Sequence, residues 1–309
     1  MAEKKRVLII GGSGFVGAHL VVAALAHGYE VAYTYLNRSF PVKEVQAKGY
    51  QVALERPDER LEICLTDFQP QTVIYCAVPP FVYANGDEVH QQVNVEAVRR
   101  SLEILGRVAP DALFVYISTN AVFGGGRGLY REAEIPDPEV RQDPYRTYAL
   151  TKAAGEQIAV QNWPNTLIAR TAVVDGRYVT GALYPRTAGM VESLKAGQIL
   201  VRFRDRYISP TLVDNFAEAV LEVVEPTFKY RGVLHLAGSE RVTDYQYASY
   251  LARHLGLDQN LIQAESIAAS PAMANSPRDH SLDVSFTQSL LQTRLLGVEA
   301  QLACLFPAE

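Results

Sequence analysis

The sequence predicts an α/β protein whose core is a doubly wound parallel sheet. Short apolar or β-branched stretches alternate with helix-like segments through the first half of the 309 residues, as repeated βαβ units require. A glycine-rich turn directly follows the first of these stretches, and two hydroxyl-bearing residues close the fifth. In this class of sheet we expect the strand order 3-2-1-4-5-6, with ligands bound at the carboxyl ends of the strands.

The expected strands are short and rich in apolar, β-branched or aromatic residues. They cover residues 7–10, 30–36, 50–54, 72–78, 112–118 and 166–170. Helical spacing of apolar residues predicts helices at residues 15–27, 58–67, 89–108 and 147–161. Gly28 is an end signal for the first of these helices, and Pro110 follows the end of the third.

The second half of the chain is less regular. It predicts helices at 212–224 and 244–255 and a strand at 232–236. We therefore expect a dinucleotide-binding domain at residues 1–171 and a smaller, mostly substrate-binding region at 172–309. Residues from about 208 to 236 are expected to return to the first domain.

Composition excludes several classes of function. Hydrophobic residues make up 48% of the chain and charged residues 20%, which supports a sizeable core. A net charge of −5 without a basic run argues against a nucleic-acid partner. The charged start lacks the layout of a signal peptide, and the longest apolar stretches are too short to span a membrane. Cys64, Cys76 and Cys304 are scattered, so we expect a cytoplasmic protein with neither a metal site nor a disulfide framework.

The glycine-rich turn predicts a site for the phosphates of a dinucleotide. Gly11, Gly14 and Gly17 suit a sharp turn, a close approach of backbone to pyrophosphate, and close packing of helix on strand. The helix that follows presents free N–H groups to the phosphates. A tight strand–helix turn without a ligand is the alternative. The turn residues predicted to bind the cofactor are Gly11, Ser13, Gly14, Phe15, Val16 and Gly17.

The end of the second expected strand favours NADP over NAD. An NAD-binding protein usually carries a carboxylate here to hold the ribose hydroxyls. This chain instead has Tyr35, Asn37, Arg38 and Ser39, which would suit a 2′-phosphate. NADP is therefore the expected cofactor and NAD the second choice. The alternative is that Arg38 is an ordinary solvated loop cation.

Three residues form a candidate catalytic group. Tyr148 and Lys152 lie four residues apart on an expected helix, so both side chains share one face. An ammonium beside a phenol would lower the pKa of the phenol, and the tyrosine could then exchange a proton with a substrate oxygen. Thr119 closes the fifth expected strand and could hydrogen-bond the same oxygen. The alternative for Thr119 is a purely structural role, in which its hydroxyl caps the backbone at the end of the strand.

Taken together, these motifs show that the chain resembles the extended short-chain dehydrogenases/reductases and, more narrowly, the dTDP-4-dehydrorhamnose reductase family. The glycine turn and the Tyr/Lys pair mark the superfamily, and later segments point to the reductase branch. The matching segments are residues 7–17, 73–77, 93–95, 116–123, 148–156, 170–176, 209–219, 235–240 and 276–283. The resemblance implies a Rossmann sheet with a smaller C-terminal substrate-binding region.

The resemblance also implies roles for single residues. Thr119 would be the family's Ser/Thr, Tyr148 its acid/base and Lys152 its holder of the nicotinamide ribose. Asn94 would support the active site from the long helix. Further cofactor contacts are expected from Cys76, Ala77, Val78, Arg170 and Thr171. Substrate contacts are expected from Pro80, Thr119, Asn120, Ala121, Val122, Arg202 and Arg278.

The substrate side depends on arginines and on one departure from related enzymes. A nucleotide sugar carries a diphosphate, which guanidinium groups recognise well. Arg202, Arg204 and Arg206 alternate, so on a strand they would face the same side, with a solvated strand face as the alternative. Asn120 and Ala121 stand where related sugar dehydratases carry an acid–base pair, so dehydration is not expected.

We therefore expect an NAD(P)H-dependent reductase of a keto group on a nucleotide-linked 4-keto-deoxysugar or a related ketone. The apolar loop at 79–83 also suits a less polar substrate. The alternatives are an NAD-dependent sugar epimerase that retains its cofactor, and a non-catalytic cofactor-binding regulatory subunit. A homodimer is left open.

Overall fold

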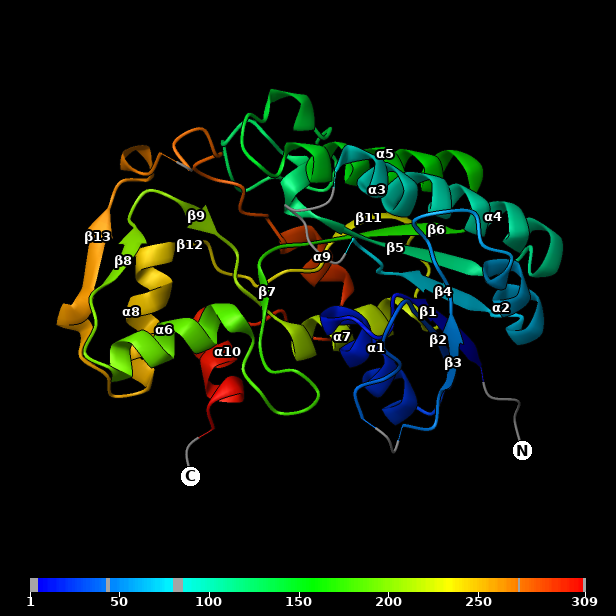
Figure 1. Cartoon of the computed structure of the whole chain (residues 1–309), viewed down its shortest axis with the longest axis horizontal. Coiled ribbons are helices and arrows are strands. Elements are labelled where there is room, and N and C mark those ends of the chain that lie inside the picture. Colours follow the sequence, from blue (N-terminus) through cyan, green and yellow to red (C-terminus); the bar gives the residue numbers. More distant parts are fainter. Residues whose placement is uncertain (1–4, 43–44, 80–85, 272, 308–309) are drawn as a thin grey trace.

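The computed structural model describes residues 5–42, 45–79, 86–271 and 273–307. Its centre is a seven-stranded sheet in the order β11-β6-β5-β4-β1-β2-β3, with every neighbouring pair parallel (Figure 1). The predicted doubly wound fold and its strand order are confirmed, and β11 adds a seventh strand beyond β6. The strands are β1 Arg6–Ile10, β2 Glu30–Tyr35, β3 Lys48–Gln51, β4 Thr72–Tyr75, β5 Leu113–Thr119, β6 Thr166–Thr171 and β11 Gly232–His235.

Helices cover both faces of this sheet, because successive strand residues point to opposite sides and both sides are apolar. On β1, Val7 and Ile9 belong to one buried cluster, and Leu8 and Ile10 to the other. The first face is covered by α1 Phe15–Ala26 and α7 Val213–Val224. The second face is covered by α2 Arg60–Phe68, α4 Ala97–Val108 and α5 Arg146–Asn162.

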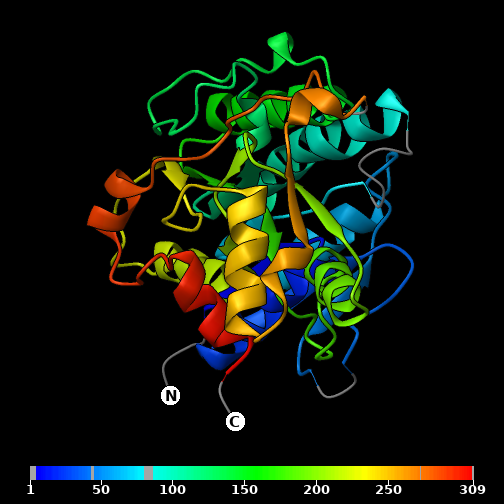
Figure 2. The ribbon, with the colours of Figure 1, turned by 90° about the vertical axis from the view of Figure 1, so that its left-hand side faces the viewer.

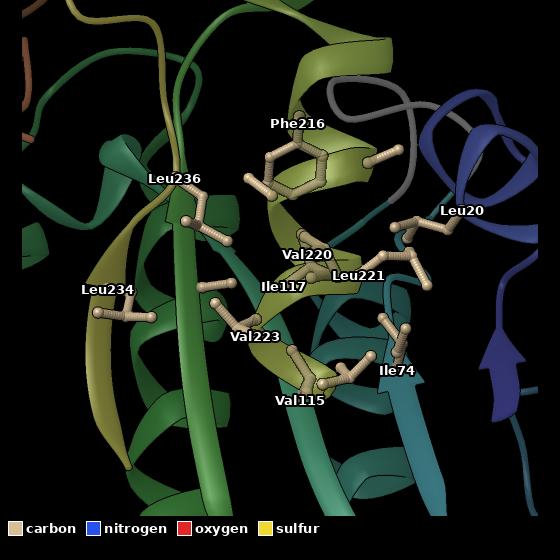
Figure 3. Packing of buried hydrophobic residues seen from close by; sticks show 14 of the residues in the cluster. Leu20, Ile74, Val115, Ile117, Phe216, Val220, Leu221, Val223, Leu234 and Leu236 are labelled. Carbon is tan, nitrogen blue, oxygen red and sulfur yellow. The ribbon is translucent and has the colours of Figure 1, made fainter. Parts of the chain in front are cut away.

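Figure 3 shows how the first face is packed. Phe216 and Val220 of α7 lie over Val115 and Ile117 of β5, and Leu20 of α1 approaches from the neighbouring side. All five residues are buried. This packing fixes α1, and therefore the glycine turn before it, against the sheet.

Two elements differ from the sequence expectation. The helix expected at 89–108 begins earlier and contains a wider turn, with α3 Asp87–Gln91, a π-helical turn η1 Gln92–Glu96 and then α4. The third strand is Lys48–Gln51 rather than 50–54, because Val52 donates the last amide to β2 and the Ala53 amide donates to the Asp58 carboxylate instead.

The second region lies at the other end of the molecule, beyond the carboxyl edge of the sheet (Figures 1 and 2). It has its own buried apolar cluster, which includes Met190, Leu251 and Leu302. Its helices are α6 Pro185–Lys195, α8 Asp244–His254 and α10 Val298–Leu305, whereas α9 Ser285–Leu290 lies against β11, whose His235 amide donates to Thr287 Oγ1. Its strands are β7 Val174–Asp175, β8 Leu200–Phe203, β9 Tyr207–Ile208, β10 Thr211–Leu212, β12 Val242–Thr243 and β13 Ile262–Glu265. Short 3-10 turns lie at η2 Asn120–Val122, η3 Pro138–Val140, η4 Gln259–Leu261 and η5 Ile267–Ala269.

Candidate active site

The glycine turn between β1 and α1 has the backbone geometry that its glycines allow. Gly11 has a φ of +90°, which side chains with a Cβ rarely adopt, and its amide donates to Thr34 Oγ1 at 2.9 Å. A Cβ on Gly17 would lie 2.2 Å from the Gly11 carbonyl oxygen, so α1 packs directly on the turn. No side chain caps the start of α1 at Gly14. The free amides there can therefore receive an anionic group.

A cavity of about 1030 Å³ opens from this turn along the carboxyl edge of the sheet. Its volume is at the upper end of the roughly 300–1,000 Å³ typical of small-molecule sites, which suits an extended dinucleotide. Fifteen of the residues expected to bind cofactor or substrate line it. They are Gly11, Ser13, Gly14, Phe15, Val16, Gly17, Tyr35, Asn37, Arg38, Cys76, Ala77, Val78, Thr119, Tyr148 and Thr171.

Several lining residues were not expected from the sequence. Thr34, Ile117, Ser118 and Ala172 lie at the ends of strands, and the strand order could have indicated them. Tyr184 comes from the start of α6, where no motif marks it. Its ring stacks on Phe15 with 4.3 Å between centroids, so the second region closes one side of the cavity. The remaining unexpected lining residues are Leu36, Val52, Leu54, Glu55, Pro79, Val89, Val93, Val173 and Val174.

Thr119 and Tyr148 meet at the cavity. The Thr119 side chain caps the turn η2 by accepting from the Ala121 amide at 3.1 Å, and it also hydrogen-bonds Tyr148. Thr119 therefore both caps the backbone and lines the cavity. Burial raises the pKa of Tyr148 to about 12, and the hydrogen bond with Thr119 only partly opposes this.

Lys152 lies one turn after Tyr148 on α5 but directs its ammonium to the sheet. Its Nζ donates to the Ile117 carbonyl oxygen at 2.6 Å and lies 3.9 Å from the centre of the Tyr116 ring. Burial lowers the pKa of Lys152 to about 7, against the opposing effect of Glu156. The expectation that Lys152 lowers the pKa of Tyr148 is wrong for this structure, because desolvation dominates at the phenol and the ammonium is bound to the strand.

Like Lys152, two further residues expected to contact the cofactor lie behind the cavity wall instead of lining it. Asn94 is fully buried in the π-helical turn, where its Nδ2 donates to Thr151 Oγ1 at 3.0 Å and so supports α5. Arg170 is buried at the end of β6 and forms an ion pair with Glu156 at 2.7 Å. A direct contact between Arg170 and a cofactor does not fit this placement, because the guanidinium group is already paired with Glu156 behind the cavity wall.

The other expected residues occupy different positions. Ser39 is exposed after β2, outside the cavity lining. Asn120 is buried and donates to the His280 carbonyl oxygen at 2.9 Å, and Ala121 accepts from Arg141 at 3.3 Å. Val122 is buried in the apolar core behind them. Pro80 and most of the apolar loop at 79–83 lie outside the described residues.

The arginines on the substrate side do not alternate along one strand. β8 ends at Phe203, so Arg204 and Arg206 follow it in a bend, and the expected shared strand face is wrong. Arg206 and Arg186 instead both pair with the Asp244 carboxylate, at 2.9 and 3.0 Å. Both guanidinium groups lie close enough to Tyr145 to oppose the rise that burial causes in the pKa of its phenol. Tyr145 lies three residues before Tyr148.

The two arginines named from the sequence differ in their exposure. Burial lowers the pKa of Arg202, whose surroundings also include Asp244 and Arg186. Arg278 is largely exposed and lies 3.9 Å from Asp205. Arg202 therefore belongs with the arginines around Asp244, whereas Arg278 lies at the surface.

The fold and the cavity define a Rossmann-type protein with the architecture of nicotinamide-dependent reductases. The chain belongs to the RmlD substrate binding domain family, whose model matches residues 5–306.

Two curated relatives are similar over nearly the whole chain. The chain is 25% identical over 305 residues to methionine adenosyltransferase 2 subunit beta of Bos taurus, covering 93% of this chain and 82% of that protein. It is also 25% identical over 301 residues to dTDP-4-dehydrorhamnose reductase of Aggregatibacter actinomycetemcomitans, covering 92% of each.

A solved structure shares the fold. The dTDP-4-dehydrorhamnose reductase of Bacillus anthracis, in complex with NADP, has a TM-score of 0.80 at 19% identity and covers 98% of this chain and 99% of its own. Within the described part of the chain, no helix has the length and apolar character needed to cross a membrane. The same residues contain no group of three or more His, Cys, Asp or Glu side chains placed to hold a metal ion.

Proposed function

We propose that this chain is an NADPH-dependent reductase of a keto group, and that its substrate is a nucleotide-linked keto sugar. The observation that carries the proposal is the shared cavity, because the glycine turn, Thr119 and Tyr148 all line it. A phosphate-binding turn and a proton donor facing one space are what carbonyl reduction by a nicotinamide requires. The name of the A. actinomycetemcomitans relative supports the same reaction class.

Each catalytic residue has a defined task in this proposal. A bound nicotinamide supplies the hydride. Tyr148 gives its phenolic proton to the substrate oxygen, and its pKa of about 12 keeps that proton in place at neutral pH until the oxygen becomes basic. Thr119 orients the same oxygen through its hydroxyl. Lys152 has two ammonium protons beyond the one held by Ile117, and in this proposal they bind the ribose hydroxyls of the nicotinamide.

NADPH is the proposed cofactor because of the chemistry at the end of β2. Asn37 and Arg38 are exposed and line the cavity, and no carboxylate occurs at positions 35–39 to repel a phosphate. The fit of the glycine turn to a pyrophosphate is the same for both dinucleotides, so this end decides the preference. The B. anthracis structure, solved with NADP, supports the choice.

We place the anionic part of the substrate beside the arginines of the second region. Arg186, Arg202 and Arg206 all lie near the Asp244 carboxylate, and Arg186 also lies near Asp175, so three guanidinium groups face two carboxylates next to Tyr145. Guanidinium groups bind phosphate oxygens in a fork, so a diphosphate would be held there with the keto sugar reaching toward Tyr148.

A second candidate function is a cofactor-binding subunit of another enzyme, which the name of the bovine relative favours. Oxidation of NADPH in the presence of a panel of nucleotide-linked keto sugars separates the two functions. A reductase consumes NADPH with at least one of them and loses that activity as Tyr148→Phe. A binding subunit retains NADPH without turnover, and Tyr148→Phe leaves its cofactor affinity unchanged.

A further inference from the structure

A buried ionic cluster lies directly below the catalytic face of α5. Tyr148, Lys152 and Glu156 are spaced four residues apart, so their side chains form one stripe along the helix. Glu156 is 5% exposed and Arg170 is 2% exposed. A buried carboxylate is costly unless it is paired and hydrogen-bonded, so its presence calls for a physical account.

The Glu156 carboxylate joins three elements at the carboxyl edge of the sheet. Arg170, at the end of β6, donates to it from Nη2 at 2.7 Å and from Nε at 3.0 Å. Ser118, near the end of β5, donates its hydroxyl to the same carboxylate. A fork of charged hydrogen bonds with a third donor fixes both distance and orientation.

This cluster is continuous with the catalytic residues. Ser118 lies between Ile117, whose carbonyl oxygen accepts from Lys152, and Thr119, which bonds Tyr148. A shift of Ser118 would therefore move an acceptor of Lys152 and a partner of Tyr148 together. We propose that Glu156 is a positioning residue that fixes the end of β5 against α5 and keeps the ammonium of Lys152 charged in its buried place. The proposal rests on the function proposed above for turnover, but its effect on cofactor binding is independent of the substrate.

The charge of Lys152 depends on few groups. Cys76 approaches from the end of β4, the Tyr116 ring lies against the ammonium from β5, and Glu156 lies one turn further along α5, with Arg170 of β6 behind it. Burial lowers the pKa of Lys152 to about 7, and Glu156 is the largest opposing influence. The pKa values of Tyr148 and Cys76 are both raised to about 12. Of Tyr148, Cys76 and Lys152, only Lys152 is therefore expected to titrate between pH 6 and 9.

The variant Glu156→Gln tests the charge. Because the carboxylate raises the pKa of Lys152, its removal lowers that pKa, and the lysine loses its proton at a lower pH. The basic limb of the kcat profile is expected to move down by about one pH unit, and the pH at which the Kd of NADPH begins to rise moves with it. The exposed Glu192→Gln on α6 loses the same charge and should leave both profiles in place.

The variant Ser118→Ala tests the positioning. It removes the hydrogen bond to Glu156 without changing a charge, so kcat is expected to fall about fivefold with the basic limb unmoved. If Glu156→Gln does not fold, Arg170→Gln gives the complementary measurement. Without Arg170, the Glu156 carboxylate is no longer neutralised and should raise the pKa of Lys152 further, which moves the basic limb to higher pH. Profiles of the folded Glu156 or Arg170 variant that coincide with wild type, whatever their amplitude, overturn the proposal. Should the wild type show no turnover at all, the proposed function fails, and the pH dependence of NADPH affinity still decides the role of Glu156.

Discussion

Replacing Gly17 by alanine tests the account of the glycine turn. An added Cβ would lie 2.2 Å from the Gly11 carbonyl oxygen and 2.7 Å from the Gly12 Cα, both closer than the 3.0 Å that real Cβ contacts respect. Both neighbours are backbone atoms and cannot rotate away. The turn would have to open by about 1 Å, a form of overpacking that typically costs roughly 1–3 kcal/mol.

Two further terms act on the same substitution. The Gly11 carbonyl oxygen accepts from the Gly14 amide at 3.1 Å, and loss of that bond adds about 1 kcal/mol. The higher helix propensity of alanine offsets about 1 kcal/mol of this destabilisation. The free energy of unfolding should therefore fall by about 1–3 kcal/mol, and NADPH affinity should fall at least about tenfold because the displaced amides are the proposed phosphate ligands.

Urea unfolding and a fluorescence titration with NADPH measure the two effects. Gly189→Ala, on the exposed side of α6, is the matched control. It has nothing within 4 Å of the added Cβ, so it should stabilise the protein by about 0.5–1 kcal/mol. The reasoning is refuted if Gly17→Ala is as stable as Gly189→Ala or binds NADPH with wild-type affinity.

Three further outcomes follow from the site. Tyr148→Phe should lower kcat at least about 100-fold in NADPH oxidation assays while the Kd of NADPH stays unchanged, and residual activity near wild type would remove its role as proton donor. Arg38→Ala should weaken NADPH about tenfold and leave NADH unaffected, as isothermal titration would show, and equal losses for both would exclude a 2′-phosphate contact. Arg206→Gln should raise KM for a nucleotide sugar about tenfold and spare a phosphate-free ketone, and steady-state kinetics with both substrates checks this.

Much of the fold could be predicted because short local sequence patterns mark its helices and strands. Val7–Ile10 is apolar throughout, as a strand buried on both faces must be, and the glycines after it fix the turn. The third strand was predicted too late in the chain, because residues 52–54 are apolar and resemble a buried strand. What ends the strand is the bond from the Ala53 amide to Asp58, a contact that no periodicity reveals.

The chemistry of the site was less predictable than its residues. Spacing placed Lys152 beside Tyr148, but the sign of the tyrosine pKa shift depends on how deeply both groups are buried and on which acceptor the ammonium finds. Likewise, nothing in the sequence shows that Arg170 faces Glu156, because the two lie on separate elements brought together only by the sheet. The prediction that Arg202, Arg204 and Arg206 share one strand face was wrong because β8 ends at Phe203, before the second of these arginines.

The end of β5 couples these separate observations. Three successive residues each hold one of three successive turns of α5: Thr119 bonds Tyr148, the Ile117 carbonyl accepts from Lys152, and Ser118 bonds Glu156. Because all three contacts use one strand and one helix, a displacement of β5 along α5 cannot change one without changing the others. Effects of substitutions at these positions should therefore be non-additive, as expected for residues in one hydrogen-bonded network. Buried ion pairs in general contribute little net stability, and this coupling gives a physical reason for the pair of Glu156 and Arg170 below Tyr148 and Lys152.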